Sequence, residues 1–253
     1  MGDRVEVSEE GYIQHIFPRK NQLTRPVVAN IDYLAIQFSA KDPVIDFYRL
    51  HTLILHSMYE GILPCILINK IDLLKEEELK LLQERLSFLK AIEIPFFFIS
   101  QKENIGIEAL KTFFQGKVTA IGGPSGVGKS SLINLLQEKM HLETGETSKR
   151  LQRGKHTTKD TRLLSLPQGG YIIDTPGFSS LELPDIPNFE ALVSLFPEFQ
   201  REESCKFRDC HHIHEPSCVV RQAVEEGTIS RERYQFFQKI YHILKTERWN
   251  YGN

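Results

Sequence analysis

The sequence contains no uninterrupted apolar stretch of about 18 residues. A helix needs roughly 20 such residues to cross a bilayer, so this absence excludes a transmembrane helix. The first ten residues, MGDRVEVSEE, are too polar to form the apolar centre of a secretory signal. We therefore expect a soluble, cytoplasmic protein that has no membrane partner.

A strong charge imbalance is also missing. The formal net charge is only −2, which argues against a protein that is basic over its whole surface. Positive charge gathers instead in two short stretches, KRLQRGKHTTKDTR at 149–162 and FPRKNQLTRP at 17–26. Either stretch could neutralise phosphate groups, although solvated charge on a loop is an equally good interpretation.

Cysteine is scarce, and three of the four cysteines lie within 14 residues of one another. In a reducing cytosol such clustering favours a metal site over a disulfide. Three thiols and an imidazole form a common structural zinc set, with reactive or simply buried cysteines as the alternatives. The candidate ligands are Cys205, Cys210 and Cys218 with His211, His212 or His214, and the spacing does not decide among the histidines.

Repeats and low-complexity tracts are absent, and a hydrophobic content of 41% is ordinary for a globular protein. In residues 1–26 we expect two short strands, GDRVEV and GYIQHIF, joined by a turn at Ser8-Glu9-Glu10. Two strands alone cannot bury a core, so this segment needs other strands beside it.

Apolar segments alternate with amphipathic ones between residues 27 and 183. This alternation predicts a doubly wound α/β domain with a mostly parallel sheet that is covered on both faces. The expected strands are 31–40, 64–69, 94–100, 117–122 and 171–177, and the expected helices are 46–60, 76–90, 105–114 and 129–139. No strand pattern follows residue 184, so we expect a small helical domain around the metal site in residues 184–253.

Residues 123–130, GPSGVGKS, match the phosphate-loop pattern G-x-x-x-x-G-K-[ST] between an apolar strand and a helix. The glycines let backbone N–H groups converge on phosphate oxygens at a helix N-terminus. Lys129 would reach the β- and γ-phosphates, and the Ser130 hydroxyl would bind Mg²⁺. The sequence therefore predicts a nucleoside triphosphate site. Its candidate contacts are Gly123, Pro124, Ser125, Gly126, Val127, Gly128, Lys129, Ser130 and Ser131.

Asp174-Thr175-Pro176-Gly177 ends a strand and matches D-x-x-G, in which the Asp holds Mg²⁺ through water and the Gly N–H senses the γ-phosphate. Thr157 and Thr158 are candidates for a threonine that closes over Mg²⁺. Many GTPases carry a water-orienting glutamine after D-x-x-G, but this chain has Phe178 there. We therefore expect slow intrinsic hydrolysis, with the missing group supplied by another loop or by a partner.

The residues Asn69-Lys70-Ile71-Asp72 match N-K-x-D, the signature that reads guanine. The Asp72 carboxylate can accept hydrogen bonds from guanine N1–H and N2–H₂, which adenine does not offer. The motif precedes Gly123 by 54 positions, whereas ordinary GTPases carry it after the phosphate loop. An exposed loop at a strand end is the competing interpretation.

A circular permutation would explain this order. Joining two neighbouring termini and cutting the chain elsewhere preserves a fold, and it can move the base-reading strand ahead of the phosphate loop. Such a permutation requires a second base-contacting loop before Gly123, for which Ser100, Gln101 and Lys102 are candidates. Both motifs would then meet beyond the carboxyl ends of the strands.

Together these motifs resemble the ribosome small-subunit-dependent GTPases of the RsgA (YjeQ) type. The resemblance covers nearly the whole chain and rests on RPVVANIDYLAI, NKID, GPSGVGKSSLIN, RGKHTT, DTPGFSSLEL and CKFRDCHHIHEPSC. It implies a permuted GTPase domain at 27–183, preceded at 1–26 by the last part of an OB barrel and followed by a zinc-binding helical domain at 184–253. It also implies GTP hydrolysis with Mg²⁺ and one structural Zn²⁺. The small (30S) subunit and its rRNA would be the partners, and the protein would act late in maturation of that subunit.

The resemblance assigns further roles. It places the zinc ligands at Cys205, Cys210, His212 and Cys218, which favours His212 over its neighbours. His156 matches a family histidine thought to act in hydrolysis, so that His156, Lys129 and Thr158 are the catalytic candidates. Contact with phosphate or RNA is the alternative role for His156. We expect a monomer.

One departure concerns the N-terminus, because members of this family usually carry several more barrel strands before Gly2. We therefore expect a mis-set start site at Met1. A chain that is truly this short would put RNA binding through an OB face in doubt.

Two other functions fit parts of the sequence. An ATP-using phosphate-loop enzyme would keep its nucleotide preference when Asp72 is replaced by asparagine. A GTP-loaded RNA-binding switch would have no useful turnover.

Overall fold

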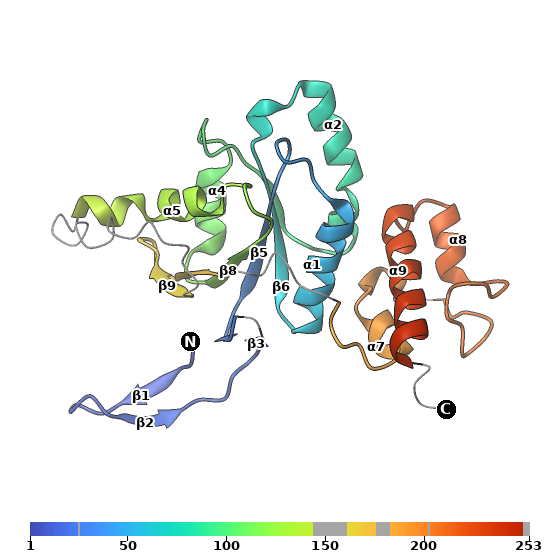
Figure 1. Ribbon diagram of the computed structural model, residues 1–253, viewed down its shortest axis with the longest axis horizontal. Coiled ribbons are helices and arrows are strands. Elements are labelled where there is room, and N and C mark those ends of the chain that lie inside the picture. Colours follow the sequence, from blue (N-terminus) through green and yellow to red (C-terminus); the bar gives the residue numbers. More distant parts are fainter. Residues whose placement is uncertain (25, 144–160, 176–182, 202, 250–253) are drawn as a thin grey trace.

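A six-stranded sheet forms the centre of the computed structural model, which describes all residues except 25, 144–160, 176–182, 202 and 250–253 (Figure 1). The strand order is β7-β6-β5-β8-β10-β9. The strands are β5 (Tyr33–Ser39), β6 (Leu63–Asn69), β7 (Phe96–Phe98), β8 (Val118–Gly122), β9 (Arg162–Ser165) and β10 (Tyr171–Asp174). Neighbouring strands are parallel except for β9, which pairs antiparallel with β10 at the edge. The mostly parallel sheet is confirmed, whereas the short edge strand β9 was not predicted.

Helices cover both faces of this sheet (Figure 1). They are α1 (Phe47–Tyr59), α2 (Glu76–Arg85), α3 (Phe88–Ala91), α4 (Ile107–Phe114) and α5 (Lys129–Glu143), with a short 3₁₀ helix, η1 (Ile71–Leu73), after β6. Successive side chains of a strand point to opposite faces. In β5, Leu34 and Ile36 therefore pack with α1 and α3, while Ala35 packs with α4 and α5. Because both faces are buried, the central strands are continuous apolar runs.

The helix expected over residues 76–90 is two helices. The N–H of Ser87 donates to the carbonyl of Glu84, and the N–H of Leu89 donates to that of Leu86, so the chain tightens into a turn between α2 and α3. No residue of α2 is buried, whereas Leu86 and Leu89 are both fully buried. Burial of these two leucines against the sheet therefore outweighs continuation of the exposed helix.

The N-terminal segment forms the two strands that the sequence predicts. β1 (Val5–Val7) and β2 (Ile13–Ile16) pair antiparallel, and the Ser8 hydroxyl accepts a hydrogen bond from the Tyr12 N–H at 3.2 Å in the connecting turn. Every residue of both strands is exposed, and the hairpin projects away from the sheet (Figure 1). The pair β3 (Gln22–Leu23) and β4 (Val28–Ala29) follows, and its leucine and valine enter the main core. Assignment of the hairpin to an OB barrel stays a prediction.

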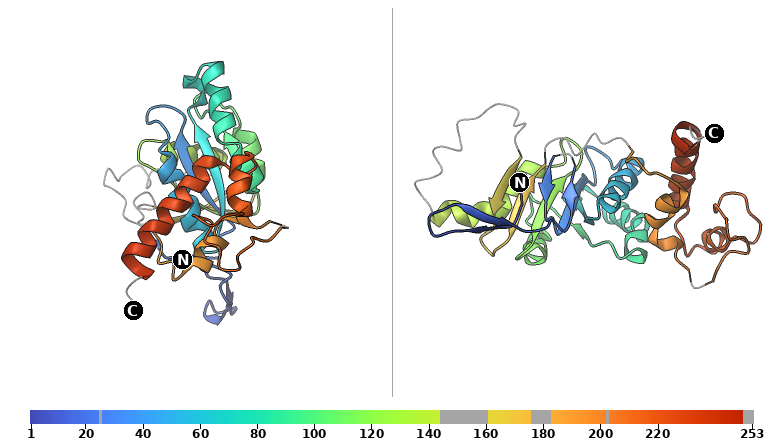
Figure 2. Two further views of the ribbon diagram at one scale, coloured as in Figure 1. Left: turned by 90° about the vertical axis from the view of Figure 1, so that its right-hand side faces the viewer. Right: turned by 90° about the horizontal axis from the view of Figure 1, so that it is seen from below.

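The C-terminal helices form a separate hydrophobic cluster rich in aromatic rings. The right-hand view of Figure 2 shows that these helices lie at one end of the molecule. They are α7 (Phe189–Ser194), η3 (Pro197–Phe199), α8 (Val219–Glu225) and α9 (Arg231–Leu244), and a π-helical turn, Lys245–Trp249, follows α9. In the described residues no strand follows residue 184. No helix of the described chain is both long and apolar enough to cross a membrane.

Helix α1 joins the two parts of the molecule. One face of α1 packs on the sheet, while Leu55 belongs to the core of the C-terminal helices. The ring of Tyr48 lies 5.4 Å from that of Phe236 on α9. His51 is buried between Phe88 and Phe236, and burial lowers the pKa of its imidazole to about 3, so the ring is neutral.

A buried ion pair makes the C-terminal helices sensitive to one substitution. The Arg233 Nε donates to Glu198 Oε1 at 2.8 Å, and only 1% of the Arg233 side chain is exposed. Glu198→Ala should therefore cost about 3 kcal/mol of unfolding free energy, since it leaves a buried guanidinium without its carboxylate. Urea unfolding measures this loss. Lys80→Met, which breaks the exposed 2.9 Å pair with Glu76, should cost under about 0.5 kcal/mol, and equal losses would contradict the prediction.

Candidate functional site

The phosphate-loop motif lies between β8 and α5, and its backbone presses against the neighbouring strands. A Cβ built at Gly123, where φ is 131°, would lie 2.1 Å from the carbonyl oxygen of Gln37. A Cβ at Gly128, where φ is 98°, would lie 2.7 Å from the Asn69 Nδ2. Both the positive φ and the close approach therefore require glycine at these two positions.

A lysine and an aspartate face each other across this loop. The Lys129 Nζ donates to the carbonyl oxygens of Gly123 at 2.8 Å and Pro124 at 2.6 Å. Burial lowers the pKa of Lys129, and the charge of Asp174 at the end of β10 opposes that shift. Burial raises the pKa of Asp174, and the charge of Lys129 opposes this shift in turn. Because Ser130 lies exposed in the first turn of α5, the loop offers a cation and oxygen ligands, as a Mg²⁺-bound triphosphate requires.

The N-K-x-D motif reaches the same edge of the sheet. Asn69 is the last residue of β6, and its buried Nδ2 donates to the carbonyl of Val127 at 2.9 Å. Lys70 adopts a left-handed conformation, and its Nζ donates to the carbonyl of Gly126 at 3.1 Å and to that of Asp42. Two motifs that are 54 positions apart in the sequence are thus hydrogen-bonded to each other.

The carboxylate of Asp72 is held by a buried serine. Asp72 lies in η1, and its Oδ1 accepts a hydrogen bond from the Ser100 hydroxyl at 2.5 Å. Ser100 is fully buried and also accepts from the N–H of Glu103 at 3.1 Å. Within the described residues the second carboxylate oxygen of Asp72 accepts no hydrogen bond, so it is available to a base.

Two of the three residues predicted to form the second base-contacting loop lie at the nucleotide site. Besides Ser100, Gln101 reaches the site, because its Nε2 donates to the carbonyl of Gly128 at 3.1 Å and its N–H donates to the Asn69 Oδ1 at 3.4 Å. Lys102 instead points to solvent and pairs with Glu103 at 3.4 Å. The loop after β7 therefore lies between the base-reading motif and the phosphate loop.

Sequence reasoning missed Gln37, a residue of this site on β5. Gln37 is fully buried, and its Nε2 donates to the carbonyl of Val127 at 2.8 Å. The available signal was a single polar side chain within the apolar run IDYLAIQFSA.

Several predicted residues lie outside the described part of the chain. They are His156, Thr157, Thr158, Gly177 and Phe178. The roles given to them from the sequence stay predictions.

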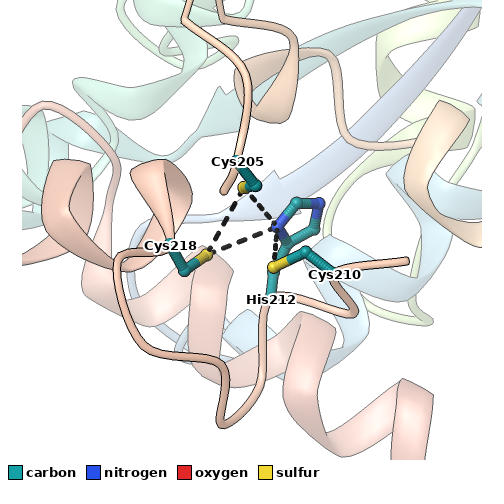
Figure 3. Close-up of side chains that lie close together, drawn as sticks. All are labelled: Cys205, Cys210, His212 and Cys218. Atoms are coloured by element: carbon teal, nitrogen blue, oxygen red, sulfur yellow. Dashed lines mark hydrogen bonds between the residues drawn. The ribbon is translucent and has the colours of Figure 1, made fainter. Parts of the chain in front are cut away.

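The predicted metal ligands converge on one point, as Figure 3 shows. One donor atom from each of Cys205, Cys210, His212 and Cys218 lies within 4.8 Å of all the others. The His212 Nδ1 is 3.6, 3.5 and 3.4 Å from the sulfurs of Cys205, Cys210 and Cys218, and the sulfurs of Cys205 and Cys218 are 3.9 Å apart. Around tetrahedral zinc, sulfurs lie about 3.8 Å apart and sulfur and nitrogen about 3.6 Å apart. These four distances match those of a structural zinc ion held by the four side chains.

The contacts of His211, His212 and His214 show which of the three histidines is placed to be the fourth metal ligand. The His211 Nδ1 is engaged by the Tyr241 hydroxyl at 2.8 Å, and His214 is exposed. His212 adopts a positive φ of 61°, and its carbonyl accepts from the Tyr234 hydroxyl at 2.7 Å. The turn thus directs the His212 ring toward the three sulfurs (Figure 3).

Glu215 organises the loop between the last two ligands. Its carboxylate accepts from the backbone N–H groups of His211, Ile213 and His214 at 2.9 to 3.0 Å. Burial opposes ionisation of Glu215, but these hydrogen bonds outweigh it and lower the pKa of the carboxyl to about 2. The loop geometry is therefore fixed by a carboxylate that is not itself a member of the ligand cluster.

Known proteins resemble this chain over nearly its whole length. The family model described as RsgA GTPase matches residues 16–184. A protein of Fusobacterium nucleatum named small ribosomal subunit biogenesis GTPase RsgA is 58% identical over 250 residues, which span 99% of this chain and 87% of that protein. The crystal structure of YjeQ from Thermotoga maritima superposes with a TM-score of 0.81 at 35% identity and covers 98% of this chain and 84% of that one.

A second solved structure bears on the order of the motifs. YloQ, described as a circularly permuted GTPase, superposes with a TM-score of 0.78 at 31% identity over 97% of this chain and 79% of its own. The early position of N-K-x-D and its contact with the later phosphate loop agree with that description, so the predicted permutation is confirmed. With the family model matching most of its length and this degree of identity to named members, the chain belongs to the RsgA GTPase family.

Proposed function

We propose that this chain hydrolyses GTP, that the small (30S) ribosomal subunit stimulates the hydrolysis, and that the protein acts through rRNA binding in late maturation of that subunit. The hydrogen bond between Asn69 and Val127 carries the proposal, because it joins a guanine-reading motif to a phosphate loop. The name of the Fusobacterium relative supports the ribosomal role.

The proposed contacts with GTP follow the geometry of the sheet edge. Asp72 would accept from the guanine base, with Asn69, Lys70 and Ile71 beside it, and Lys129 would neutralise the β- and γ-phosphates. Ser130 would hold Mg²⁺ through its hydroxyl and Asp174 through water. The remaining proposed contacts are Gly123 to Gly128, Ser131 and Gly177. Mg²⁺ would stabilise the charge that develops on the phosphates.

The proposed organisation assigns each part of the chain a task. Residues 1–26 would belong to an OB-type segment, 27–183 would bind and hydrolyse GTP, and 184–253 would hold one structural Zn²⁺. We propose that the protein works as a monomer in the cytoplasm.

The deciding experiment measures GTP hydrolysis with and without purified small subunits. We expect the subunit to raise the turnover number at least tenfold, since partner-supplied groups raise GTPase rates by about 10³ or more in other systems. Large subunits serve as the control and should have no effect. GTP binding without stimulated turnover would instead identify a binding switch.

A further inference from the structure

We propose that Gln37 is a positioning residue of the nucleotide site, which holds the phosphate loop in its binding conformation through the carbonyl of Val127. The inference rests on the guanine-nucleotide site proposed above but not on the ribosome, because it concerns the affinity of the isolated protein for guanine nucleotides.

Three side-chain amides surround the end of the phosphate loop. Gln37 from β5 and Asn69 from β6 donate to the same acceptor, the carbonyl oxygen of Val127, at 2.8 and 2.9 Å. Gln101, from the loop after β7, donates to the next carbonyl, that of Gly128, at 3.1 Å. Two neighbouring strands and the loop after a third thus supply three donors to two adjacent peptide groups.

These contacts also orient the backbone N–H of Gly128, on the opposite side of the loop. In a planar trans peptide the C=O and the following N–H point in opposite directions. A carbonyl of Val127 that is held toward β5 and β6 therefore directs the Gly128 N–H away from the sheet. Backbone N–H groups that point away from the sheet are what a phosphate loop uses to bind phosphate oxygens.

The environment makes Gln37 difficult to replace. Its side chain is fully buried, and its Oε1 has no hydrogen-bond partner in the described residues. A buried oxygen without a partner destabilises the folded protein, whereas a leucine or methionine would carry no such cost. The hydrogen bond that the NH₂ group donates to the Val127 carbonyl therefore explains a glutamine at this position better than packing does.

Gln37 should act on phosphate affinity and leave base selectivity unchanged. Asp72, the carboxylate that would face the base, is bonded to Ser100 and not to Gln37. A change at Gln37 should consequently weaken the binding of GTP, GDP and xanthosine triphosphate (XTP) by the same factor.

The test compares Gln37→Glu with the wild type by titrating fluorescent GDP between pH 6 and pH 8.5. A buried glutamate has a raised pKa, of roughly 8 in such sites. When protonated it donates an O–H to Val127 in place of the amide, and when ionised it repels that carbonyl. We expect near wild-type affinity at pH 6 and about fourfold weaker binding at pH 8.5, where roughly three quarters of the glutamate is ionised.

The wild type measured at each pH corrects for the other ionisable groups of the surrounding elements. These are Lys70 and Asp72 beyond β6, Lys129 on α5 and Asp174 on β10, and both proteins contain them. Thr119→Val is the matched control, since Thr119 lies on the neighbouring strand β8 and is equally buried, and its hydroxyl has no partner in the described residues. It should leave affinity unchanged.

A Gln37→Glu profile parallel to that of the wild type would overturn the proposal, as would an equal loss in Thr119→Val. If circular dichroism shows that the glutamate variant does not fold, Gln37→Met tests the same contact. It keeps the volume but removes one of the two donors to Val127. A five- to tenfold loss for GTP, GDP and XTP alike supports the proposal, and wild-type affinity overturns it.

Discussion

Asp72→Asn should exchange the preference for guanine nucleotides for a preference for xanthine nucleotides. An asparagine amide donates a hydrogen bond where the carboxylate accepts one, so it is mismatched with the guanine amino group and matched with the xanthine oxygen. A site that is built to hydrogen-bond one group rejects an analogue lacking it by about 10⁴-fold. We expect GTP to bind about 100-fold more weakly and the ratio of GTP to XTP affinity to change by about 10⁴-fold.

Competition binding with GTP, XTP and ATP measures this change. Glu103→Gln is the control, because Glu103 is an exposed carboxylate in the neighbouring loop, and it should leave selectivity unchanged. Ser100→Ala removes the donor to Asp72 and should weaken GTP binding only several-fold, since the carboxylate remains. If Asp72→Asn keeps a preference for GTP, then N-K-x-D is only a strand-end loop. An unchanged preference for ATP would identify an ATP-using enzyme.

Most of the fold could be predicted because the signals are local. Fully buried parallel strands are apolar runs, and the helices between them carry apolar residues at helical spacing. The sequence pattern of residues 27–183 therefore predicts alternating strands and helices. The edge strand β9 could not be predicted in this way, because three of the four residues of Arg162–Ser165 are exposed and only one is partly buried. The break between α2 and α3 was also missed, because burial of Leu86 and Leu89 is a tertiary effect that helix periodicity does not report.

The site was predictable where chemistry follows a fixed spacing. The phosphate loop, N-K-x-D and the three cysteines were identified because their residues lie close together in sequence. Gln37 belongs to no such pattern, and its partner Val127 lies 90 residues away. The choice of His212 over His211 as the metal ligand likewise depends on Tyr241 of α9, whose hydroxyl is hydrogen-bonded to the His211 ring. Sequence spacing carries no information about contacts of this kind.

Cys210→Ser should release the zinc ion and unfold the C-terminal helices. Cys210 and Cys218 are buried and pack in the same hydrophobic cluster as Phe199 and Ile213, so the metal site and the helical core stabilise each other. Structural zinc contributes about 10 kcal/mol or more to small domains that depend on it. We expect zinc content to fall from one ion per chain to near zero, with loss of the helical signal of residues 184–249.

Elemental analysis and thermal unfolding followed by circular dichroism measure these two effects. Cys65→Ala is the matched control, because it also removes a buried thiol, in β6, and should keep one zinc ion per chain. GDP binding should survive in Cys210→Ser, since the nucleotide site lies on the sheet, whose cores are separate from that of the C-terminal helices. Retention of zinc by Cys210→Ser would contradict the tetrahedral site.

The histidines provide a second, independent test of the same site. His212→Gln should lose zinc as Cys210→Ser does, because its Nδ1 lies 3.4 to 3.6 Å from all three sulfurs. His211→Gln should keep zinc and lose the contacts of its ring with Tyr241 and Phe189, at a cost of about 1 to 2 kcal/mol. The two residues are adjacent in sequence and alike in chemistry, so a difference between them can arise only from the fold. If both variants lost zinc equally, disruption of the loop would explain the effect, and His212 would have no distinct role as a ligand.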